Sequence, residues 1–384
     1  MTIEIESPEQ LREYFLLNPD VAFLNHGSFG ACPKPVFENY QAWQREIESE
    51  PVRFIGNRQG DLLTNARQRL AGYLNADDSD IAFITNATSG VNVVARSMKL
   101  QPGDEILGTD LEYGACDYTW QHLCDRFGAT YVKQPIPMPL ASKEAVIDAL
   151  FAGVTANTKA IYISHITSGT SFIMPVAEIC QRARELGILS VVDGAHAPGQ
   201  VPIDLAAIDA DFYTGNLHKW LCAPKGAAFL YARKDQQDWV ESLTISWGWH
   251  PGHTFVSRNQ QQGTQDVSRY LAVPAAIDFQ EQHNWPEVRA SCHRRLRRFR
   301  EQLHARFGTA PLYPEDGGWY AQMGLITLPV DDVSGLNQRL YDDYAVEVPF
   351  TSHAGWNFVR VSVQGYVSDN DLDRLATALT EIIG

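Results

Sequence analysis

The sequence lacks several features that mark whole classes of protein. It has no run of 18 apolar residues and so predicts no membrane-spanning helix. Its first residues, Met1–Glu4, lack the basic and apolar stretches of a secretory signal, and none is expected. Its six cysteines show no CxxC spacing, which favours free thiols over disulfides or a zinc site. Free thiols are typical of a reducing compartment, so we expect a cytoplasmic protein without a bound metal.

Basic residues are also in deficit. The 384 residues include 31 lysines and arginines against 46 aspartates and glutamates, which gives a formal net charge of −15. An acidic surface repels nucleic acids and anionic membranes, so the sequence predicts neither as a partner. The basic segment 294–300 is the exception, and because it lies in a helical pattern we interpret it as a solvated helix face.

Short apolar runs alternate with helical patterns over the first two thirds of the chain. The predicted strands are 21–25, 81–84, 105–108, 129–132, 160–164, 190–193, 210–213 and 227–231. This alternation predicts an α/β fold with a mainly parallel, doubly wound sheet. Later strands at 323–328 and 358–363, with helices around them, predict a smaller α+β domain. We expect an N-terminal helical segment at 1–20 packed with the small domain, a large domain at 21–270 and the small domain at 271–384.

Polar clusters follow several of these strands. They lie at 85–90, 109–114, 164–170, 193–196 and 214–219. Because the carboxyl ends of parallel strands meet at one edge of a sheet, the clusters are expected to converge on one crevice.

One cluster contains the residue that best indicates a chemistry. Lys219 stands between His218 and Trp220 just past a strand, and Asp193 ends an earlier strand. A lysine near a carboxylate suits a Schiff-base site, and pyridoxal phosphate needs both groups. A carboxylate beside the pyridine nitrogen favours its protonated form, which makes the ring a better electron acceptor.

Two polar turns leave alternatives open. Thr85–Gly90 precedes a helix, so its hydroxyls and backbone N–H groups suit either a helix cap or a phosphate site. Asn25–Gly30 is either a plain connection or a wall of the pocket.

Motifs along nearly the whole chain resemble the class V aminotransferase family of fold-type-I pyridoxal-phosphate enzymes, and most of all its isopenicillin N epimerase-like group. The Asp-x-Ala-His motif at 193–196 followed by His-Lys-Trp at 218–220 carries most of the likeness. Further matching segments are Phe23–Gly30, Asn86–Thr88, Asp110–Ala115, Ser164–Ser168, Gly263–Thr264 and Val359–Ser362.

The resemblance implies roles for residues that match these motifs. Lys219 would hold pyridoxal phosphate as a Schiff base and shuttle the proton at Cα of the substrate, and Asp193 would pair with the pyridine nitrogen. His196 would contact the phenolic oxygen, and Tyr113 would stack on the ring and act as a second catalytic group. The remaining cofactor contacts would come from Asn86, Ala87, Thr88, Ser89, Ser168, Thr214, Asn216 and His218.

The resemblance also implies a small amino-acid substrate and a homodimer. Arg360 would bind the substrate carboxylate, a task that suits the planar guanidinium, with Asn25 and His26 nearby. Thr264 would reach the cofactor phosphate of the partner subunit. Taken alone, Tyr113 also suits ordinary packing, and Arg360, which alternates with valines on a strand, also suits a solvent-facing position.

Several reactions share these residues. The group likeness favours epimerisation or racemisation, with Lys219 on one face of the cofactor and Tyr113, or a histidine of 247–253, on the other. A C–S β-lyase acting on cysteine, cystine or a cysteine sulfoxide is the alternative, and an aminotransferase is a third. A cysteine desulfurase is disfavoured because 346–356 contains no nucleophilic cysteine. A non-catalytic scaffold is disfavoured because Lys219 and Asp193 are both present.

Overall fold

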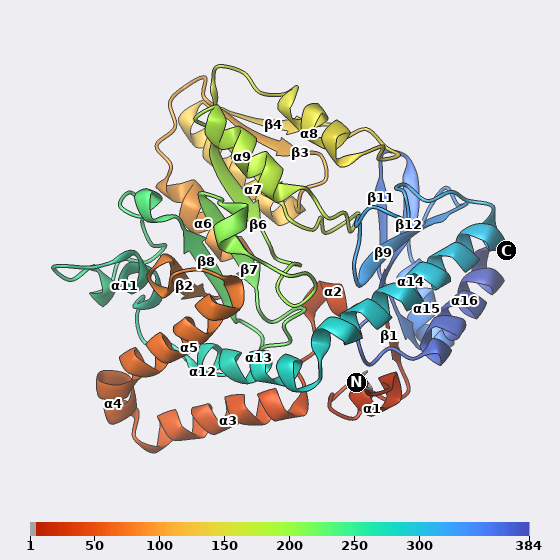
Figure 1. Cartoon of the computed structure of the whole chain (residues 1–384), viewed down its shortest axis with the longest axis horizontal. Helices are drawn as coiled ribbons and strands as arrows, with labels where there is room; N and C mark the ends of the chain where they lie inside the picture. The colour runs from red at the N-terminus through yellow and green to blue at the C-terminus, as the bar shows by residue number, and fades with distance from the viewer. Residues whose placement is uncertain (1–4, 384) are drawn as a thin grey trace.

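A seven-stranded sheet organises the larger part of the molecule (Figure 1). The computed structural model describes residues 5–383, so Met1–Glu4, where no secretory signal is expected, lie outside the described residues. The strands are β2 (Ile81–Ile84), β3 (Glu105–Thr109), β4 (Thr130–Gln134), β5 (Thr158–Ser164), β6 (Leu189–Asp193), β7 (Phe212–Asn216) and β8 (Ala228–Ala232). Their order is β2-β8-β7-β6-β5-β3-β4, and β8 runs in the opposite direction to the other six strands. The predicted mainly parallel sheet is therefore confirmed.

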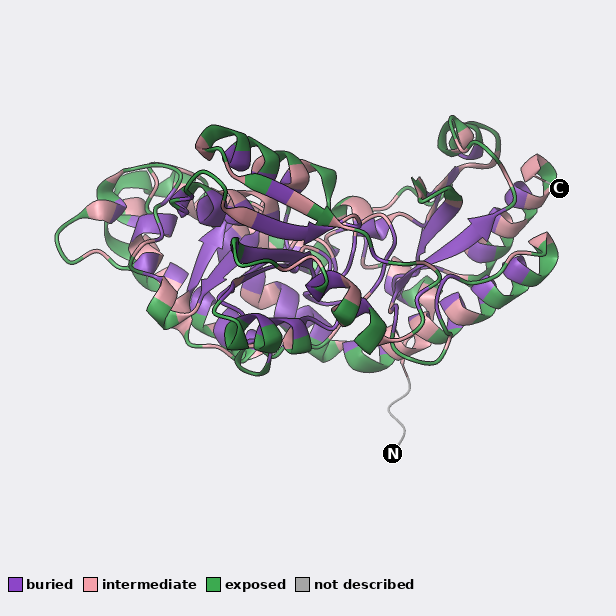
Figure 2. Ribbon diagram, turned by 90° about the horizontal axis from the view of Figure 1, so that it is seen from above, coloured by how far each residue is buried: buried purple, intermediate pink, exposed green. Residues whose placement is uncertain are grey.

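Helices cover both faces of this sheet, and Figure 2 shows its buried strands between helices with exposed outer faces. Successive residues of one strand enter different cores. Ala160 and Tyr162 pack with α6 (Ala87–Ser97) and α7 (Gly114–Phe127), whereas Ile161 and Ile163 pack into the core that contains α5, α8 and α9. Strands buried on both faces are continuous apolar runs, which explains why the sequence pattern predicts them. The other helices of this part are α3 (Lys34–Ser49), α4 (Pro51–Arg53), α5 (Gln59–Leu74), α8 (Lys143–Phe151), α9 (Val176–Glu185), α10 (Leu205–Ile208), α11 (Phe255–Gln260), α12 (Ser268–Leu271) and α13 (Val273–Gln282).

A smaller antiparallel sheet lies in the C-terminal part. Its order is β11 (Phe350–His353), β12 (Trp356–Ser362) and β9 (Met323–Leu328). It packs with α14 (Trp285–Phe307), and α15 (Leu336–Tyr344) and α16 (Asp369–Ile383) complete this part. The predicted α+β architecture is confirmed, although the sequence pattern does not reveal β11 or the short β10 (Val346–Glu347).

The N-terminal segment packs against this C-terminal part. In α1 (Pro8–Arg12), Arg12 faces Asp371, and the ring of Phe15 just beyond it contacts Tyr366 edge-on. The next strand, β1 (Ala22–Phe23), pairs in parallel with β10. Because α13 packs on α3 and α5 whereas α14 packs on β9, we propose a domain boundary near 283–285, later than the predicted 270–271.

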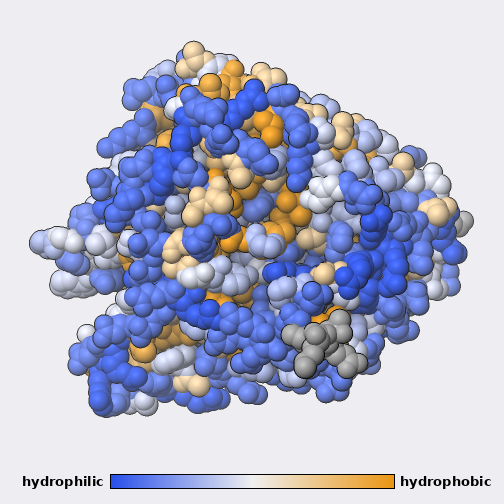
Figure 3. All heavy atoms as spheres, viewed as in Figure 1, coloured by the Kyte–Doolittle hydropathy of each residue, from blue (hydrophilic) through white to orange (hydrophobic). Residues whose placement is uncertain are grey.

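The prediction that the basic segment 294–300 is a solvated helix face is wrong for Arg300. Arg300 is fully buried, donates to Leu325 O and Glu315, each at 2.8 Å, and lies over two tyrosine rings. Its guanidinium is tolerated because it is paired and hydrogen-bonded. Figure 3 shows one face of the whole molecule, which is hydrophilic over most of its area with hydrophobic residues gathered near the middle. Within residues 5–383 we find no helix long and apolar enough to cross a membrane.

Two turns pack without clearance against the segment that carries Lys219. Gly30 ends the short helix α2 (His26–Phe29) with φ +70°, and a Cβ there would lie 2.2 Å from His218 O. Gly199 has φ +88°, and a Cβ there would lie 2.3 Å from the backbone of Trp220. The backbone at 218–220 is therefore held by two turns, one near the N-terminus and the other after β6.

We expect Gly30→Ala to lower the free energy of unfolding by about 3 kcal/mol, because it adds a backbone clash to an unfavourable positive φ. The matched control is Gly103→Ala, since Gly103 has φ +89° but no atom lies within 4 Å of the place a Cβ would take. That control isolates the conformational cost of about 1 kcal/mol. Urea unfolding measures the free energy of unfolding of both variants. Equal decreases would show that the Gly30 turn accommodates the added Cβ without further cost.

Candidate active site

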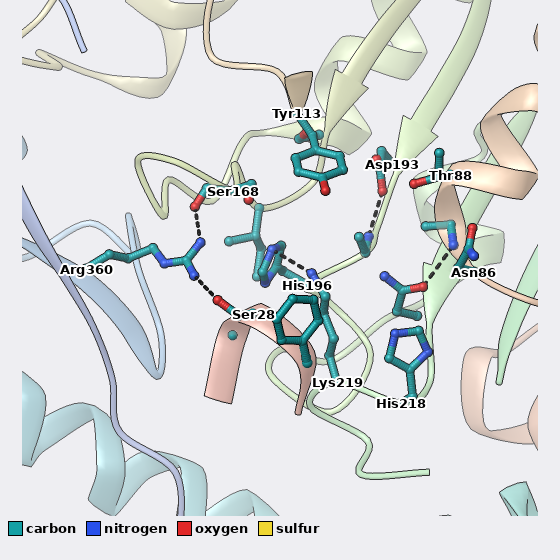
Figure 4. A pocket seen from close by; sticks show the side chains of 17 residues that line it. Ser28, Asn86, Thr88, Tyr113, Ser168, Asp193, His196, His218, Lys219 and Arg360 are labelled. Atoms are coloured by element: carbon teal, nitrogen blue, oxygen red, sulfur yellow. Dashed lines mark hydrogen bonds between the residues drawn. The ribbon is translucent and has the colours of Figure 1, made fainter. Parts of the chain in front are cut away.

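The polar clusters that follow the strands meet in one pocket of about 330 Å³, shown from close by in Figure 4. It gathers eleven of the residues predicted from the sequence: Asn86, Ala87, Thr88, Tyr113, Ser168, Asp193, His196, Asn216, His218, Lys219 and Arg360. Six further residues complete its wall: Gly27, Ser28, Phe29, Ser164, Ile166 and Ala195. The crevice expected at the carboxyl ends of the strands is therefore present.

Lys219 follows β7, and its Nζ lies 3.1 Å from His196 Nε2. Burial lowers the pKa of Lys219 to about 8, and the positive charge of Arg360 contributes to the same shift, while Asp193 opposes it. Desolvation disfavours the charged ammonium, so a substantial neutral fraction exists at mildly alkaline pH. A neutral buried amine is a nucleophile, which a surface lysine at this pH is not.

Asp193 ends β6 and is held from three sides. Its Oδ1 accepts from the backbone N–H of Ala195 at 2.9 Å, and its Oδ2 accepts from the Tyr162 hydroxyl at 3.2 Å. The Cys116 thiol lies 3.7 Å from Oδ2. Burial raises the pKa of Asp193, whereas the Ala195 N–H and the charge of Lys219 oppose the rise. This carboxylate is oriented and close to a cation, as a partner for a protonated ring nitrogen must be.

His196 lies between Lys219 and an indole. The Nε1–H of Trp220 points to Nδ1 of His196 at 3.5 Å, and burial lowers the pKa of the ring. A neutral imidazole that accepts at Nδ1 carries its proton on Nε2, the atom that faces Lys219. His196 can therefore donate a hydrogen bond into the pocket.

The N-terminus of α6 forms another wall, and Asn86 is its cap. The Asn86 side chain accepts from Ser89 N at 2.8 Å, while Asn216 accepts from Ala87 N at 2.8 Å. The side chains of Thr88 and His218 also line the pocket. Backbone N–H groups and hydroxyls at a helix N-terminus attract an anion such as phosphate. The turn thus contains a helix cap and a possible anion site together.

Arg360 on β12 extends into the other end of the pocket (Figure 4). Its Nη1 donates to Ser168 O at 2.6 Å and its Nη2 donates to Ser28 Oγ at 3.0 Å. Nη2 also lies 3.5 Å from Asn25 Oδ1, whereas Nε is buried without a protein partner. Among residues 5–383 the partners of the guanidinium are thus a backbone carbonyl, a hydroxyl and an amide oxygen, and no carboxylate. Burial lowers the pKa of Arg360 to about 10, so it stays charged at neutral pH. A buried cation without a protein anion is suited to an anionic ligand.

Five residues predicted for the site do not line this pocket: Asn25, His26, Ser89, Thr214 and Thr264. The hydroxyl of Thr214 donates to Phe229 O at 2.9 Å, and the Ser89 hydroxyl donates to the Asn86 side chain. Thr264 is exposed on a loop of its own chain. Asn25 lies just behind the lining, where its Oδ1 accepts from Ser28 Oγ at 2.5 Å and from Arg360 Nη2 at 3.5 Å. The other four side chains are directed elsewhere by their local partners or position.

His26, expected to contact substrate, lies behind the pocket. Its ring is 2.9 Å from the Tyr366 hydroxyl and 3.0 Å from Lys219 O, and burial lowers its pKa to about 3. The reason is that 26–29 form a helical turn, which presents Gly27, Ser28 and Phe29 to the pocket instead. His26 therefore supports the backbone of Lys219 and connects it to the C-terminal part.

Sequence reasoning also missed a buried cluster beside the pocket. Glu112 accepts from Ser164 N at 2.8 Å, from Ser164 Oγ at 2.6 Å and from Thr109 Oγ1 at 2.6 Å. Its only sequence signal is its place in a polar cluster that follows a strand. All six cysteines lie within the described residues, and none of them lines the pocket.

Comparison with known proteins places this geometry in a family. The model of the family Aminotransferase class-V matches residues 30–375. Isopenicillin N epimerase of Amycolatopsis lactamdurans is 36% identical, over 97% of each chain, and that of Streptomyces clavuligerus is 32% identical, over 98% of each. A putative L-cysteine desulfhydrase 1 of Oryza sativa is 30% identical, over 94% of this chain and 83% of its own length.

Solved structures agree on the fold. A complex of the cystine C–S lyase C-DES with cysteine persulfide superposes with a TM-score of 0.82 at 20% identity, covering 94% of this chain and 98% of the lyase chain. The apo cysteine desulfurase of Thermococcus onnurineus NA1 gives 0.82 at 19% identity, covering 99% of each chain. The family match and the full-length relatives together show that this chain is an enzyme of the class V aminotransferase family.

Proposed function

We propose that this enzyme binds pyridoxal phosphate and acts at Cα of an amino acid, as an epimerase or racemase. The observation that carries this proposal is that Lys219 and Tyr113 enter one pocket from opposite sides, with Arg360 at its end (Figure 4). Inversion at Cα needs a group that removes the proton on one face and a group that returns it on the other. The resemblance to isopenicillin N epimerases supports the same reaction.

The residues present fit pyridoxal phosphate, a cofactor that members of this family use. Lys219 would attach it covalently, Asp193 would hold its pyridine nitrogen and His196 its phenolic oxygen. Its phosphate would be held at the N-terminus of α6 by Asn86, Ala87, Thr88, Asn216 and His218. Ser89 and Thr214 would act through their bonds to Asn86 and β8 rather than by contact. When bound, the cofactor supplies an electron sink for the charge left at Cα.

The chain's own residues would then handle the substrate. Arg360 would bind its carboxylate with the guanidinium, which has no protein carboxylate as partner, while Ser168 O and Ser28 hold that guanidinium in place. Asn25 accepts from the Ser28 hydroxyl at 2.5 Å and from Arg360 Nη2 at 3.5 Å, and so supports Arg360 both directly and through Ser28. The neutral amine of Lys219 would take the proton from Cα on its side. Tyr113 would return a proton from the opposite side.

A C–S β-lyase is the second candidate, because full-length relatives include putative cysteine desulfhydrases. In that reaction Lys219 takes the same proton, but a thiol leaves from Cβ and no second base is needed. Transamination uses the same residues again. A persulfide-forming desulfurase is disfavoured, since the pocket has no cysteine.

The assembly and location expected from the sequence belong to this proposal. A homodimer would bring Thr264 to the partner's cofactor, and the exposure of Thr264 outside its own pocket is compatible with that role. The aromatic side chains of Phe29 and Tyr113 at the pocket are also exposed, by 72% and 47%. A cytoplasmic location would keep the six free thiols reduced.

Lys219→Ala should abolish covalent attachment of the cofactor. Freshly reconstituted variant is expected to lack the absorbance band of lysine-bound pyridoxal phosphate and to lose Cα–H exchange by at least about a thousandfold. Lys225→Ala is the matched control, because Lys225 is close in sequence and its ammonium donates to Gly30 O, away from the pocket lining. A band that persists in Lys219→Ala would refute the whole proposal.

Attachment of the cofactor should depend on pH through Lys219. The neutral amine is the nucleophile, so the rate of reconstitution of the apo-enzyme is expected to rise with pH and to level off above about 8. Because the charge of Arg360 helps lower this pKa, Arg360→Ala should move the rise to higher pH. Arg360→Lys keeps the charge and should leave the midpoint in place. Stopped-flow absorbance measures the midpoint, and an unchanged value in Arg360→Ala would contradict this electrostatic account.

Epimerase and lyase are separated by their products in deuterium oxide. For an epimerase we expect deuterium at Cα of a recovered amino acid of inverted configuration, and no pyruvate from L-cystine or a cysteine sulfoxide. Tyr113→Phe should then keep exchange at Cα but lose inversion by about 100-fold or more, because only Lys219 still moves the proton. Chiral chromatography with mass spectrometry reads both. Pyruvate release at full rate by Tyr113→Phe would favour the lyase.

A further inference from the structure

A half-buried carboxylate outside the pocket lining, that of Glu112, connects the turn of Tyr113 with Thr109 and with Ser164. Glu112 stands in the turn between β3 and α7, directly before Tyr113, which caps α7. Its Oε2 accepts from both the backbone N–H and the hydroxyl of Ser164, and its Oε1 accepts from Thr109. Thr109 itself accepts from Leu111 N at 3.2 Å, so its proton is free to be donated to Glu112. Three donors on one carboxylate are more than a surface glutamate in a turn receives.

The contacts of Glu112 extend to Asp193, the residue that would face the pyridine nitrogen of the cofactor. Ser164 ends β5 and is the register partner of Asp193 on β6. The N–H of His165, the next residue, donates to Asp193 O at 2.8 Å. On the other side, Cys116 in the first turn of α7 donates its N–H to Tyr113 O at 2.8 Å and directs its thiol to Asp193. Two routes thus link Tyr113 to Asp193. One runs through the neighbouring residue Glu112, its hydrogen bonds to Ser164 and the pairing of Ser164 with Asp193, and the other runs through Cys116.

We propose that Glu112 is a positioning residue of the active site, whose carboxylate holds the turn that presents Tyr113 against the end of β5 beside Asp193. The role given to Tyr113 rests on the proposed function. Glu112 does not line the pocket and so would act on substrate and cofactor only through other residues. It acts through Ser164 on one side and through the backbone of Tyr113 on the other.

The charges around Glu112 give this arrangement a pH signature. Burial raises the pKa of Glu112 to about 7, and Asp193 adds to the rise, whereas the bonds from Ser164 and Thr109 oppose it. The other titratable groups that face it are Cys116 on α7, Tyr131 on β4 and Tyr162 on β5. Burial raises the pKa of each of them, so they stay uncharged at neutral pH. Above about pH 7 Glu112 is ionised and accepts all three bonds, and below it one acceptor position carries a proton.

The first test compares Glu112→Gln with Glu105→Gln. Glu105 lies at the opposite end of the same strand, β3, and its carboxylate likewise accepts from threonine hydroxyls, Thr155 at 2.5 Å and Thr158 at 3.4 Å. We expect Glu112→Gln holoenzyme to lose about 10- to 100-fold in kcat for inversion with KM within about twofold, because Tyr113 is misplaced rather than the substrate released. In wild type, kcat should rise as Glu112 ionises near pH 7, and this rise should be missing in Glu112→Gln. Glu105→Gln should match wild type in both.

A second readout needs neither cofactor nor activity. In apo-protein labelled with 3-fluorotyrosine, the fluorine resonance of Tyr113, assigned by its loss in Tyr113→Phe, should shift with a midpoint near pH 7 as Glu112 titrates. In Glu112→Gln this resonance should move or broaden and should not titrate there. If wild type fails to act on any amino acid, the proposed function is wrong, yet this measurement still tests the position of Tyr113.

Ser164→Ala covers the case in which Glu112→Gln does not fold. It removes one of the three donors and should reproduce a smaller part of the fluorine shift and of the loss in kcat, and the double variant should lose less than the two single losses combined. A Tyr113 resonance and a kcat profile equal to wild type in either foldable variant would overturn the proposal. So would losses in kcat that are fully additive in the double variant.

Discussion

Two cationic side chains line one pocket, Arg360 buried and Lys219 half-buried, and the rest of the site follows from how the chain tolerates them. Removing a charge from water is costly unless the group is paired, hydrogen-bonded or neutralised. The two residues meet this cost differently. Lys219 has a pKa lowered to about 8 and can become neutral, whereas Arg360 stays charged and donates to Ser168 O and Ser28. An amine that is easily neutralised suits carbonyl chemistry, and an unpaired buried guanidinium suits a carboxylate ligand.

The order of apolar runs and polar clusters along the chain predicts those site residues that lie at the ends of the sheet strands. Each buried strand is a continuous apolar run that ends in a polar cluster, so Asp193 and Lys219 can be placed near each other without coordinates. Strands β10 and β11 could not be found in this way. They have two and four residues with mixed burial, which is too short for a periodic pattern. They form by pairing with β1 and β12, and β1 is remote from β10 in the sequence.

The residues that sequence reasoning misplaced are those whose direction depends on tertiary packing. Polar residues in a Gly-rich turn such as 25–30 can face a pocket in several ways, and the helical turn selects Ser28 over His26 because Gly30 must pack against His218. Glu112 was missed for a related reason. A glutamate in a turn between a strand and a helix has the pattern of an exposed residue, and only the position of Ser164 on the neighbouring strand shows that its carboxylate is enclosed by donors.

The position of Glu112 also bears on which reaction the site performs. Elimination of a thiol needs a base on the Lys219 side only, so the exact place of Tyr113 would matter little. Inversion needs a proton donor at a defined position on the other side, and a misplacement of about 1 Å can cost about 100-fold in rate. Tyr113 is 47% exposed, so packing alone restrains it weakly. The half-buried carboxylate of Glu112, directly before Tyr113 in the sequence, accepts three hydrogen bonds and would supply the restraint that inversion requires. If Tyr113 has the role that we propose for it, its surroundings suit epimerisation better than elimination.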